Sequence, residues 1–418
     1  MNPSDTLVIV GAGHAGGRAA LTLREAGFAG RIVLIGDEAH LPYERPPLSK
    51  ALLKGGFKGE CSLASCSLFS EASFIASGIE HLSGVRVTGI DTAQHSVVLD
   101  TGVSLVYSKL LLALGGTSRR LELAEHQLSN VHYLRTFDEA VELEKRLSPG
   151  TRLVVVGGGF IGLEVASSAR DRGCEVTVLE AGARLAARAL PERVSEALLT
   201  LHRCKGVVVR LAAQIEAFHG EKRIDSVQLA SGKRIPCDVL LVGIGMQPNL
   251  ELAHQAGLET GSGIKVDAFL QTSAEDVYAA GDVCEFARND GVFHRQETWR
   301  NAEAQGRVAA LNMLGQQQPF TGVPGFWSDH FEFGLQTVGV LAADAQIIER
   351  EGVEGGFLLL YLDRQSRLVG ASGWGAGNSI AKDIKLCERL IESQTVLPTQ
   401  QLADASVSLK GLLRGAHA

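Results

Sequence analysis

The stretch LVIVGAGHAG, residues 7–16, decides the fold, and LVVVGGGFIG, residues 153–162, repeats its pattern 146 residues later. In each stretch an apolar run typical of a buried strand leads into glycines spaced Gly-x-Gly-x-x-Gly, and a helix-like segment follows. Such glycines allow a tight turn and let backbone amides approach a pyrophosphate, whose charge the helix N-terminus favours. One copy can be an ordinary strand–turn–helix connection, but two matched copies predict two dinucleotide-binding units. The glycines expected to line the cofactors are Gly11, Gly13, Gly16, Gly157, Gly159 and Gly162.

Composition places the chain among α/β proteins of about three domains. Of its 418 residues, 45% are hydrophobic, 21% are charged and 48 are glycine. The net charge of −7 argues against nucleic acid as a partner, although Arg119 and Arg120 leave a local basic site. The first strand is expected near Thr6, and no apolar run approaches the ~20 residues that span a bilayer. We therefore expect no signal peptide, no membrane partner and a cytoplasmic protein.

The seven cysteines show no Cys-x-x-Cys pair, so neither a metal site nor a disulfide framework is expected. Cys61 and Cys66 have the Cys-x4-Cys spacing of flavin disulfide reductases, which makes a redox disulfide an alternative. In those enzymes the pair lies on the first helix after the ribose-binding strand. Here residues 41–50 take that place without a cysteine. Reduced thiols are the expectation.

Two apolar strands that end in glycine, residues 111–116 and 239–245, indicate where the chain crosses between domains. After the second, a strand that ends in Gly281 and Asp282 suits a return to the first cofactor. The last segment alternates strand patterns with one helix, expected over 379–393. The expected domains are a first nucleotide domain at 1–116 and 244–322, a second at 117–243, and a C-terminal domain at 323–418.

Acidic residues after the second strand of each unit indicate which nucleotides bind. Glu180 ends a strand where an adenosine ribose lies, so it should accept both ribose hydroxyls and repel a 2′-phosphate. Arg184 argues for NADPH, but it has no second basic neighbour, and NADH is favoured. In the first unit the acid, Asp37, falls one position later than Glu180 does.

The segment YERPPLSK, residues 43–50, orients a lysine. Its two prolines fix an extended approach and suit the first turn of a helix, so Lys50 leaves on a defined face. The alternative is a solvated surface lysine. In the functional interpretation Glu164, two residues past the second fingerprint, holds Lys50 where it stabilises negative charge on a flavin as hydride arrives. Asp282 would accept a hydrogen bond from the flavin's sugar-like chain, and a helix from Arg300 would point its positive end at the ring.

The chain resembles the FAD-dependent NADH:ferredoxin reductases of bacterial aromatic-ring dioxygenases and some cytochromes P450, the biphenyl dioxygenase reductase and putidaredoxin reductase type. The matching stretches are residues 43–50, 157–164, 243–249, 281–283 and 326–329. The resemblance implies a glutathione-reductase-like α/β fold with two Rossmann-type nucleotide-binding domains and a C-terminal α/β domain.

The resemblance also implies site residues. Those implied for FAD are Ala15, Asp37, Arg45, Lys50, Val87, Arg135, Asp282 and Trp299. Those implied for NADH are Gly159, Ile161, Glu164, Glu180 and Gly245. Trp327 is implied to lie near the exposed flavin edge, between flavin and ferredoxin. For Trp299 and Trp327, packing in a core is the alternative.

Three positions depart from the family's pattern. Leu114 replaces a threonine, so that contact must be made by backbone alone, and His330 stands where relatives often have glutamine. Trp299-Arg300 replaces a more variable pair. These departures affect the surface for the electron acceptor more than the cofactors.

The predicted function is electron transfer from NADH through FAD to a [2Fe–2S] ferredoxin, which feeds a terminal oxygenase. The absence of a predicted disulfide favours a one-electron outlet. One alternative is a reductase of a rubredoxin or of a small acceptor such as monodehydroascorbate. Another is a redox interaction protein like apoptosis-inducing factor, in which NADH binding changes assembly.

Overall fold

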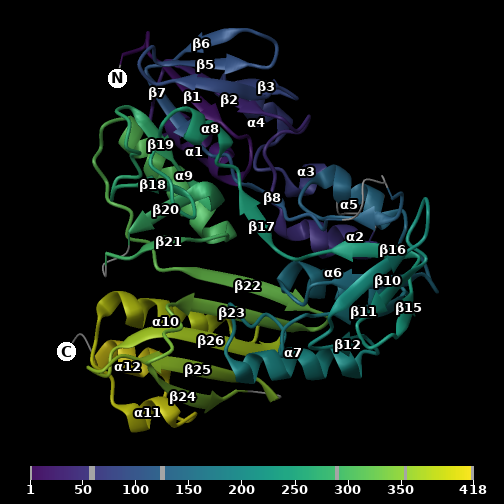
Figure 1. The fold of residues 1–418 in the computed structure, drawn as a ribbon. Coiled ribbons are helices and arrows are strands. Elements are labelled where there is room, and N and C mark those ends of the chain that lie inside the picture. The colour runs from purple at the N-terminus through teal and green to yellow at the C-terminus, as the bar shows by residue number, and fades with distance from the viewer. Residues whose placement is uncertain (1, 56–61, 123–127, 288–290, 353–354, 416–418) are drawn as a thin grey trace. The chain divides into compact units, whose positions relative to one another are not determined.

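The computed structural model describes residues 2–55, 62–122, 128–287, 291–352 and 355–415 (Figure 1). The chain divides into two compact units. The first unit contains residues 1–47, 60–117 and 246–322, and the second contains 48–59, 118–245 and 323–418.

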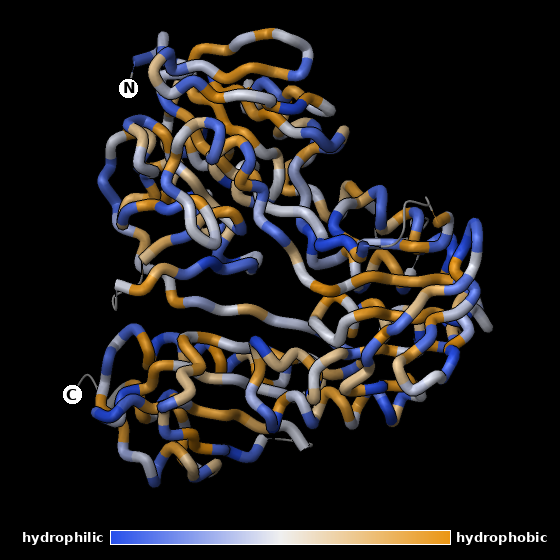
Figure 2. The backbone as a smooth tube through the Cα atoms, in the orientation of Figure 1, coloured by the Kyte–Doolittle hydropathy of each residue, from blue (hydrophilic) through white to orange (hydrophobic). Residues whose placement is uncertain are grey.

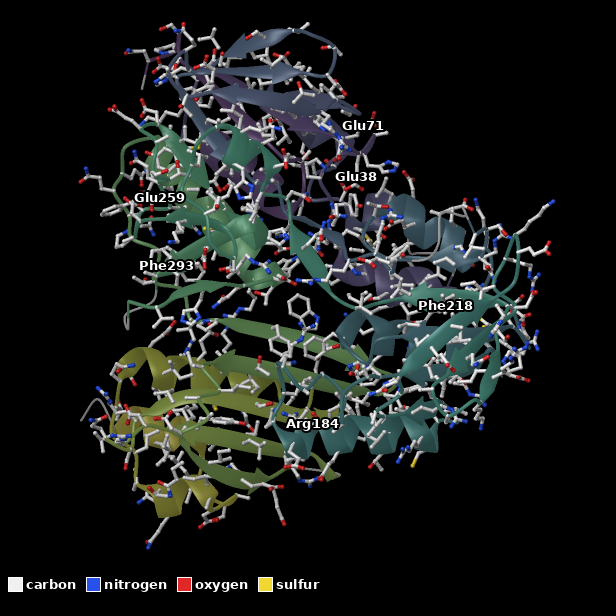
Figure 3. All side chains as sticks on the ribbon, in the orientation of Figure 1. Glu38, Glu71, Arg184, Phe218, Glu259 and Phe293 are labelled. Atoms are coloured by element: carbon white, nitrogen blue, oxygen red, sulfur yellow. The ribbon has the colours of Figure 1, made fainter. Side chains whose placement is uncertain are left out.

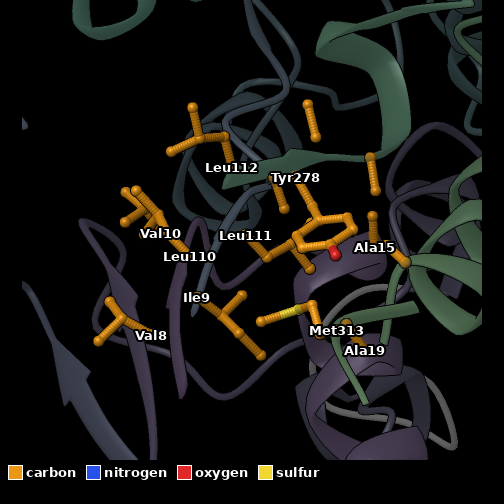
Figure 4. Close-up of a cluster of buried hydrophobic side chains, with 14 of the residues drawn as sticks. Val8, Ile9, Val10, Ala15, Ala19, Leu110, Leu111, Leu112, Tyr278 and Met313 are labelled. Carbon is orange, nitrogen blue, oxygen red and sulfur yellow. The ribbon is translucent and has the colours of Figure 1, made fainter. Parts of the chain in front are cut away.

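The first unit is built on a five-stranded parallel sheet in the order β19-β7-β1-β2-β3. Its strands are β1 (Thr6–Val10), β2 (Arg31–Gly36), β3 (Glu80–Ser83), β7 (Lys109–Leu112) and β19 (Val277–Ala279). Leu7 to Val10 are all buried, because a parallel strand has both faces covered, and this explains the continuous apolar run. Figure 4 shows Val8, Ile9 and Val10 in one apolar cluster with Leu110, Leu111 and Leu112.

Two helices of the first unit touch each other closely. They are α1 (His14–Glu25) and α9 (Trp299–Met313). A Cβ atom at Gly306 would collide with the Ala15 carbonyl oxygen, so the glycine permits this approach. Contact with Ala15 places α9 beside the first fingerprint.

Smaller elements complete the first unit. Two three-stranded sheets consist of β4 (Val87–Asp91), β5 (Ser96–Leu99) and β6 (Ser104–Val106), and of β18 (Ile264–Val266), β20 (Cys284–Ala287) and β21 (Phe293–Arg295). The remaining elements are η1 (Pro46–Ser49), α3 (Leu63–Cys66), α4 (Glu71–Ser77), β8 (Gly116–Ser118), β17 (Met246–Pro248), α8 (Glu251–Gln255) and η2 (Gly281–Val283), with η1 and β8 at the boundaries of the unit.

The second unit contains another parallel sheet, in the order β12-β11-β10-β16-β9. Its strands are β9 (Val131–His132), β10 (Arg152–Val156), β11 (Glu175–Leu179), β12 (Val208–Arg210) and β16 (Val239–Val242). Around it lie α2 (Ala51–Gly55), α5 (Phe137–Glu144), α6 (Phe160–Asp171), α7 (Glu192–Cys204) and the antiparallel strands β13 (Ile215–His219), β14 (Ser226–Leu229) and β15 (Arg234–Pro236). This sheet repeats the fingerprint geometry of the first unit.

An antiparallel sheet in the order β22-β23-β26-β25-β24 forms the last part of the second unit. Its strands are β22 (Gly325–His330), β23 (Phe333–Gly339), β24 (Gln346–Glu351), β25 (Phe357–Leu362) and β26 (Leu368–Ala376). Figure 2 colours much of β25 orange, the colour of hydrophobic residues, and every residue of this strand is buried.

The end of the chain carries more helix than the sequence predicts. The expected helix is present as α10 (Ala381–Ser393), but α11 (Thr399–Ala403) and α12 (Leu409–Gly415) follow it. The expectation of a single helix there is wrong. Buried Leu402 and Leu409 join these short helices to the core that contains α10, so packing stabilises them where length and periodicity do not.

In the described part of the chain, we find no helix with both the length and the apolar character needed to cross a bilayer.

Candidate active site

The first fingerprint forms an open cradle at the start of α1. Gly11 has a φ of +109°, and a Cβ there would overlap the Ala113 carbonyl oxygen, so only glycine fits. A Cβ at Gly16 would lie only 1.9 Å from the Gly11 carbonyl oxygen. At Gly13, by contrast, the nearest atom to an added Cβ is 4.0 Å away, and no side chain caps the helix. The first amides of α1 therefore suit a pyrophosphate.

The second fingerprint repeats this arrangement at α6. Gly157 has a φ of +106° and lies against the Gly243 carbonyl, and a Cβ at Gly162 would lie 2.5 Å from the Gly157 carbonyl oxygen. No atom lies within 4 Å of an added Cβ at Gly159, and no side chain caps α6. The side chain of Ile161 is 44% exposed beside this cradle.

Glu180 closes the loop of the second fingerprint. Its two carboxylate oxygens each accept a hydrogen bond of 2.6 Å, from the amides of Gly158 and Gly182. Arg184 lies near α7 (Figure 3) and donates to the Leu190 carbonyl at 2.6 Å and to the Ser195 hydroxyl at 2.9 Å. The guanidinium of Arg184 is thus bound by oxygens of the chain itself, which favours a coenzyme without a 2′-phosphate.

The first unit places its acids differently. Gly36 occupies the position of Glu180, because Ile35 pairs with Val10 as Leu179 pairs with Val156. A Cβ at Gly36 would lie 2.5 Å from the Cβ of Ala12, so the position admits no side chain. Asp37 follows, 61% exposed, with Arg86 at 3.1 Å.

Glu38 is a polar residue of this region that the sequence analysis missed. Its carboxylate accepts from the Tyr43 hydroxyl at 2.5 Å and from Arg45 Nη2 at 2.6 Å. Burial works against the charge on Arg45, but Tyr43 and Glu38 outweigh it and raise the pKa of Arg45. The position of Glu38 next to Asp37 is the feature of the sequence that could have indicated it.

Lys50 and Glu164 form the ion pair that the sequence predicts. Lys50 Nζ lies 2.8 Å from Glu164 Oε1, and the Glu164 side chain is 4% exposed. The hydroxyls of Ser49 and Ser328 also donate to the Glu164 carboxylate, the latter at 2.5 Å. Asp329 Oδ2 lies 3.9 Å from Lys50 Nζ. Burial, with the charge of Glu164, raises the pKa of Asp329 against the opposing effect of Lys50.

Helix α6 organises this group of polar side chains. Glu164 and Ser168 lie one turn apart on it, and the Ser168 hydroxyl donates to the Ser49 carbonyl at 2.8 Å. On the same helix, the Ser167 hydroxyl accepts from the amide of Phe331, directly after β22, at 2.7 Å. One helix therefore fixes both segments that reach Glu164.

The other predicted residues are divided between the two units. In the first unit, Val87 begins β4 and is 4% exposed, and the carbonyl of Asp282 in η2 accepts from Arg295 at 3.0 Å. The ring of Trp299 packs 4.8 Å from that of His14. Helix α9 begins at Trp299 and is capped by the Thr298 hydroxyl.

In the second unit, the Arg135 amide donates to Glu139 at 2.7 Å, just before α5. Gly245 has a φ of +108°. Trp327 is half-buried on β22, where side chains alternate between the two faces of the sheet.

The redox-disulfide alternative concerns Cys61, which lies outside the described residues, and Cys66, which is buried.

Comparison with known proteins gives the family. The family model described as pyridine nucleotide-disulphide oxidoreductase matches residues 5–306, and the model described as reductase C-terminal matches residues 325–413. The chain is 36% identical over 404 residues to the p-cumate 2,3-dioxygenase system ferredoxin–NAD(+) reductase component of Pseudomonas putida, covering 97% of each chain. It is 34% identical over 410 residues to the biphenyl dioxygenase system ferredoxin–NAD(+) reductase component of Paraburkholderia xenovorans (strain LB400), covering 98% of each.

The structure superimposes on the crystal structure of the covalent putidaredoxin reductase–putidaredoxin complex with a TM-score of 0.93 at 34% identity, covering all of both chains. The expected family and α/β fold are confirmed. This chain belongs to the pyridine nucleotide-disulphide oxidoreductase family and carries its reductase C-terminal domain.

Proposed function

We propose that this protein passes electrons from NADH through FAD to a [2Fe–2S] ferredoxin, which supplies an aromatic-ring dioxygenase or a cytochrome P450. The observation that carries the proposal is the pair of open cradles at Gly13 and Gly159, one in each unit. Two cradles suit two dinucleotides in one chain, which hydride transfer from one to the other requires. The names of the relatives, ferredoxin–NAD(+) reductase components of dioxygenase systems, support the acceptor. The cytoplasm, where NADH is available, is the proposed location.

We assign FAD to residues 1–116 and 244–322, NADH to residues 117–243, and the C-terminal domain to residues 323–418. In the first unit the amides at the start of α1 would hold the FAD pyrophosphate, with Asp37 on the ribose. By the resemblance, further contacts to the cofactor would come from Arg45, Lys50, Val87, Arg135, Asp282 and Trp299. FAD supplies the conversion of a two-electron donor into a one-electron outlet.

The residues of the second unit then have separate tasks. Glu180 would bind the hydroxyls of the NADH adenosine ribose, with Ile161 and Gly245 along the dinucleotide. Lys50, held by Glu164, would keep a positive charge where the flavin gains electrons. Trp327 would stand on the route to ferredoxin.

Replacement of Glu180 by alanine should weaken NADH binding by about 1–3 kcal/mol, because the ribose hydroxyls lose a carboxylate acceptor. NADPH should be affected much less, since its 2′-phosphate gains nothing from a carboxylate. Steady-state constants for both coenzymes with wild type and Glu180→Ala measure this. A wild type that already uses NADPH better than NADH contradicts the assignment.

Replacement of Trp327 by alanine should lower the ferredoxin-coupled rate about tenfold while reduction of FAD by NADH stays within about twofold, as for loss of an interface aromatic anchor. The coupled rate should also fall as salt rises, because docking on an acidic ferredoxin uses exposed charges, whereas flavin reduction should barely respond. Stopped flow and ferredoxin-dependent cytochrome c reduction measure both on one preparation. Loss of FAD or unfolding, with the coupled rate per bound flavin intact, would instead make Trp327 a core residue.

The direct test of the proposed function is cytochrome c reduction with NADH, the protein and a [2Fe–2S] ferredoxin, omitting each in turn. We expect fast turnover only when all are present. Fast turnover with a rubredoxin or a small acceptor, and none with ferredoxin, would favour the small-acceptor alternative. Slow flavin reduction with a long-lived charge-transfer species and NADH-dependent dimerisation would favour an interaction protein like apoptosis-inducing factor.

A further inference from the structure

A chain of buried polar groups continues beyond Glu164 and ends in two histidines. The Ser328 hydroxyl bonds to Glu164 Oε1 at 2.5 Å on one side and lies 2.9 Å from His330 Nε2 on the other. Ser328 and His330 stand two residues apart on β22, so they share one face of the strand, and each is 0% exposed. The ring of His202, from α7, packs edge-on against His330 at 5.4 Å.

The hydrogen-bond inventory fixes where the protons lie. An ionised carboxylate only accepts, so Ser328 must give its single proton to Glu164. The Ser328 oxygen must then accept from His330, which places the imidazole proton on Nε2. This assignment makes His330 the donor to Ser328 and leaves its Nδ1 without a proton.

The surroundings keep that imidazole neutral. Burial, reinforced by the charge of Lys50, lowers the pKa of His330 to about 3 and outweighs a hydrogen bond with the Leu163 backbone, which acts in the opposite direction. Burial, reinforced by His330, lowers the pKa of His202 to about 3 as well. Both rings are therefore uncharged in neutral solution, and His330 can donate without adding a positive charge that would compete with Lys50 for Glu164.

We propose that Ser328 and His330 are positioning residues that hold the Glu164 carboxylate in the orientation in which it binds Lys50. His330 fixes the Ser328 hydroxyl, Ser328 and Ser49 fix the two oxygens of Glu164, and Glu164 fixes Lys50. The effect of this positioning on hydride transfer to the flavin rests on the proposed function. The tautomer of His330 does not rest on it, so the positioning proposal and the proposed function can fail separately.

The first experiment compares His330→Leu, which removes the donor, with His330→Gln, whose amide can donate to Ser328 in its place. We expect His330→Leu to slow reduction of the bound flavin by NADH about tenfold, the scale of a small misplacement of a reacting group. Its flavin midpoint potential should become more negative, with the apparent dissociation constant for NADH unchanged. His330→Gln should restore both quantities to within about twofold of wild type.

Two further variants separate positioning from stability. Ser328→Ala removes the hydroxyl itself and should reproduce the slow rate and the more negative potential of His330→Leu. Ser372→Ala is the matched control, because Ser372 is also 0% exposed, lies in the same sheet, and its hydroxyl has no hydrogen-bond partner among the described residues. It should leave the rate and the potential unchanged.

The second experiment reads the tautomer directly, by nitrogen NMR of the FAD-loaded protein labelled at its 12 histidines. The resonance that disappears in His330→Gln should report a neutral ring with the proton on Nε2 from pH 5 to pH 8. A proton on Nδ1, a ring that titrates near pH 6, or equal defects in His330→Gln and His330→Leu would each overturn the proposal. If wild type transfers no hydride at all, the proposed function fails while the tautomer still decides this inference.

Discussion

Gly157→Ala should slow reduction of the flavin by NADH by about 100-fold or more, because the new Cβ displaces the loop on which the coenzyme pyrophosphate rests. The Cβ would collide with the Gly243 carbonyl, and the φ of +106° disfavours any side chain. FAD should remain bound, since its cradle belongs to the other unit. Stopped-flow reduction and the flavin absorbance per chain measure the two effects.

Matched glycine variants make this prediction specific. Gly11→Ala should instead cause loss of FAD, because Gly11 lies against the Ala113 carbonyl as Gly157 lies against the Gly243 carbonyl. Gly150→Ala is the control for backbone strain alone, since Gly150 has a φ of +82° with open space around it. Hydride transfer within about twofold of wild type in Gly157→Ala, with FAD bound, would contradict the assignment of this loop to NADH.

Lys50→Met should slow hydride transfer about 100-fold with FAD still bound, the scale of removing one preorganised group that stabilises developing charge. Glu164→Gln should have a smaller effect in the same direction, because it leaves the lysine present but loosely held. The ion pair of 2.8 Å and the burial of Glu164 are the grounds for this expectation. Stopped-flow reduction by excess NADH gives both rates.

Lys54→Met is the matched control for Lys50. Lys54 lies one turn further along and pairs with Asp171 at 2.7 Å, with both side chains well exposed. An exposed pair of this kind contributes little, so the variant should behave as wild type. Unchanged rates of flavin reduction in both Lys50→Met and Glu164→Gln would contradict this role and support the alternative that Lys50 is a solvated surface lysine.

The parts of the site that the sequence predicts are those that local chain geometry determines. Only glycine fits against the Ala113 and Gly243 carbonyls, so the glycine spacing of each fingerprint predicts the turn of the backbone directly. The pairing of Lys50 with Glu164 was predicted from two motifs, and the ion pair is present. Their roles toward the cofactors remain predictions.

The parts that the sequence does not predict are assembled by tertiary packing. Ser328 is 164 residues from Glu164 along the chain, and Ser49 is 115 residues from it, so no local pattern links these hydroxyls to the carboxylate. The sequence marks His330 only as a departure from relatives, and its hydrogen bond to Ser328 appears only in the structure. Helix α11 has only five residues and was missed for the same reason, since packing of Leu402 stabilises it.

The most direct test of electron transfer from NADH through FAD to ferredoxin is a double-mixing stopped-flow experiment. The FAD-loaded protein is first mixed without oxygen with one equivalent of NADH, and then with an oxidised [2Fe–2S] ferredoxin. We predict bleaching of the flavin in the first step, followed by its reoxidation as two equivalents of ferredoxin are reduced. A flavin that NADH does not reduce, or a reduced flavin that leaves the ferredoxin oxidised, would contradict the account.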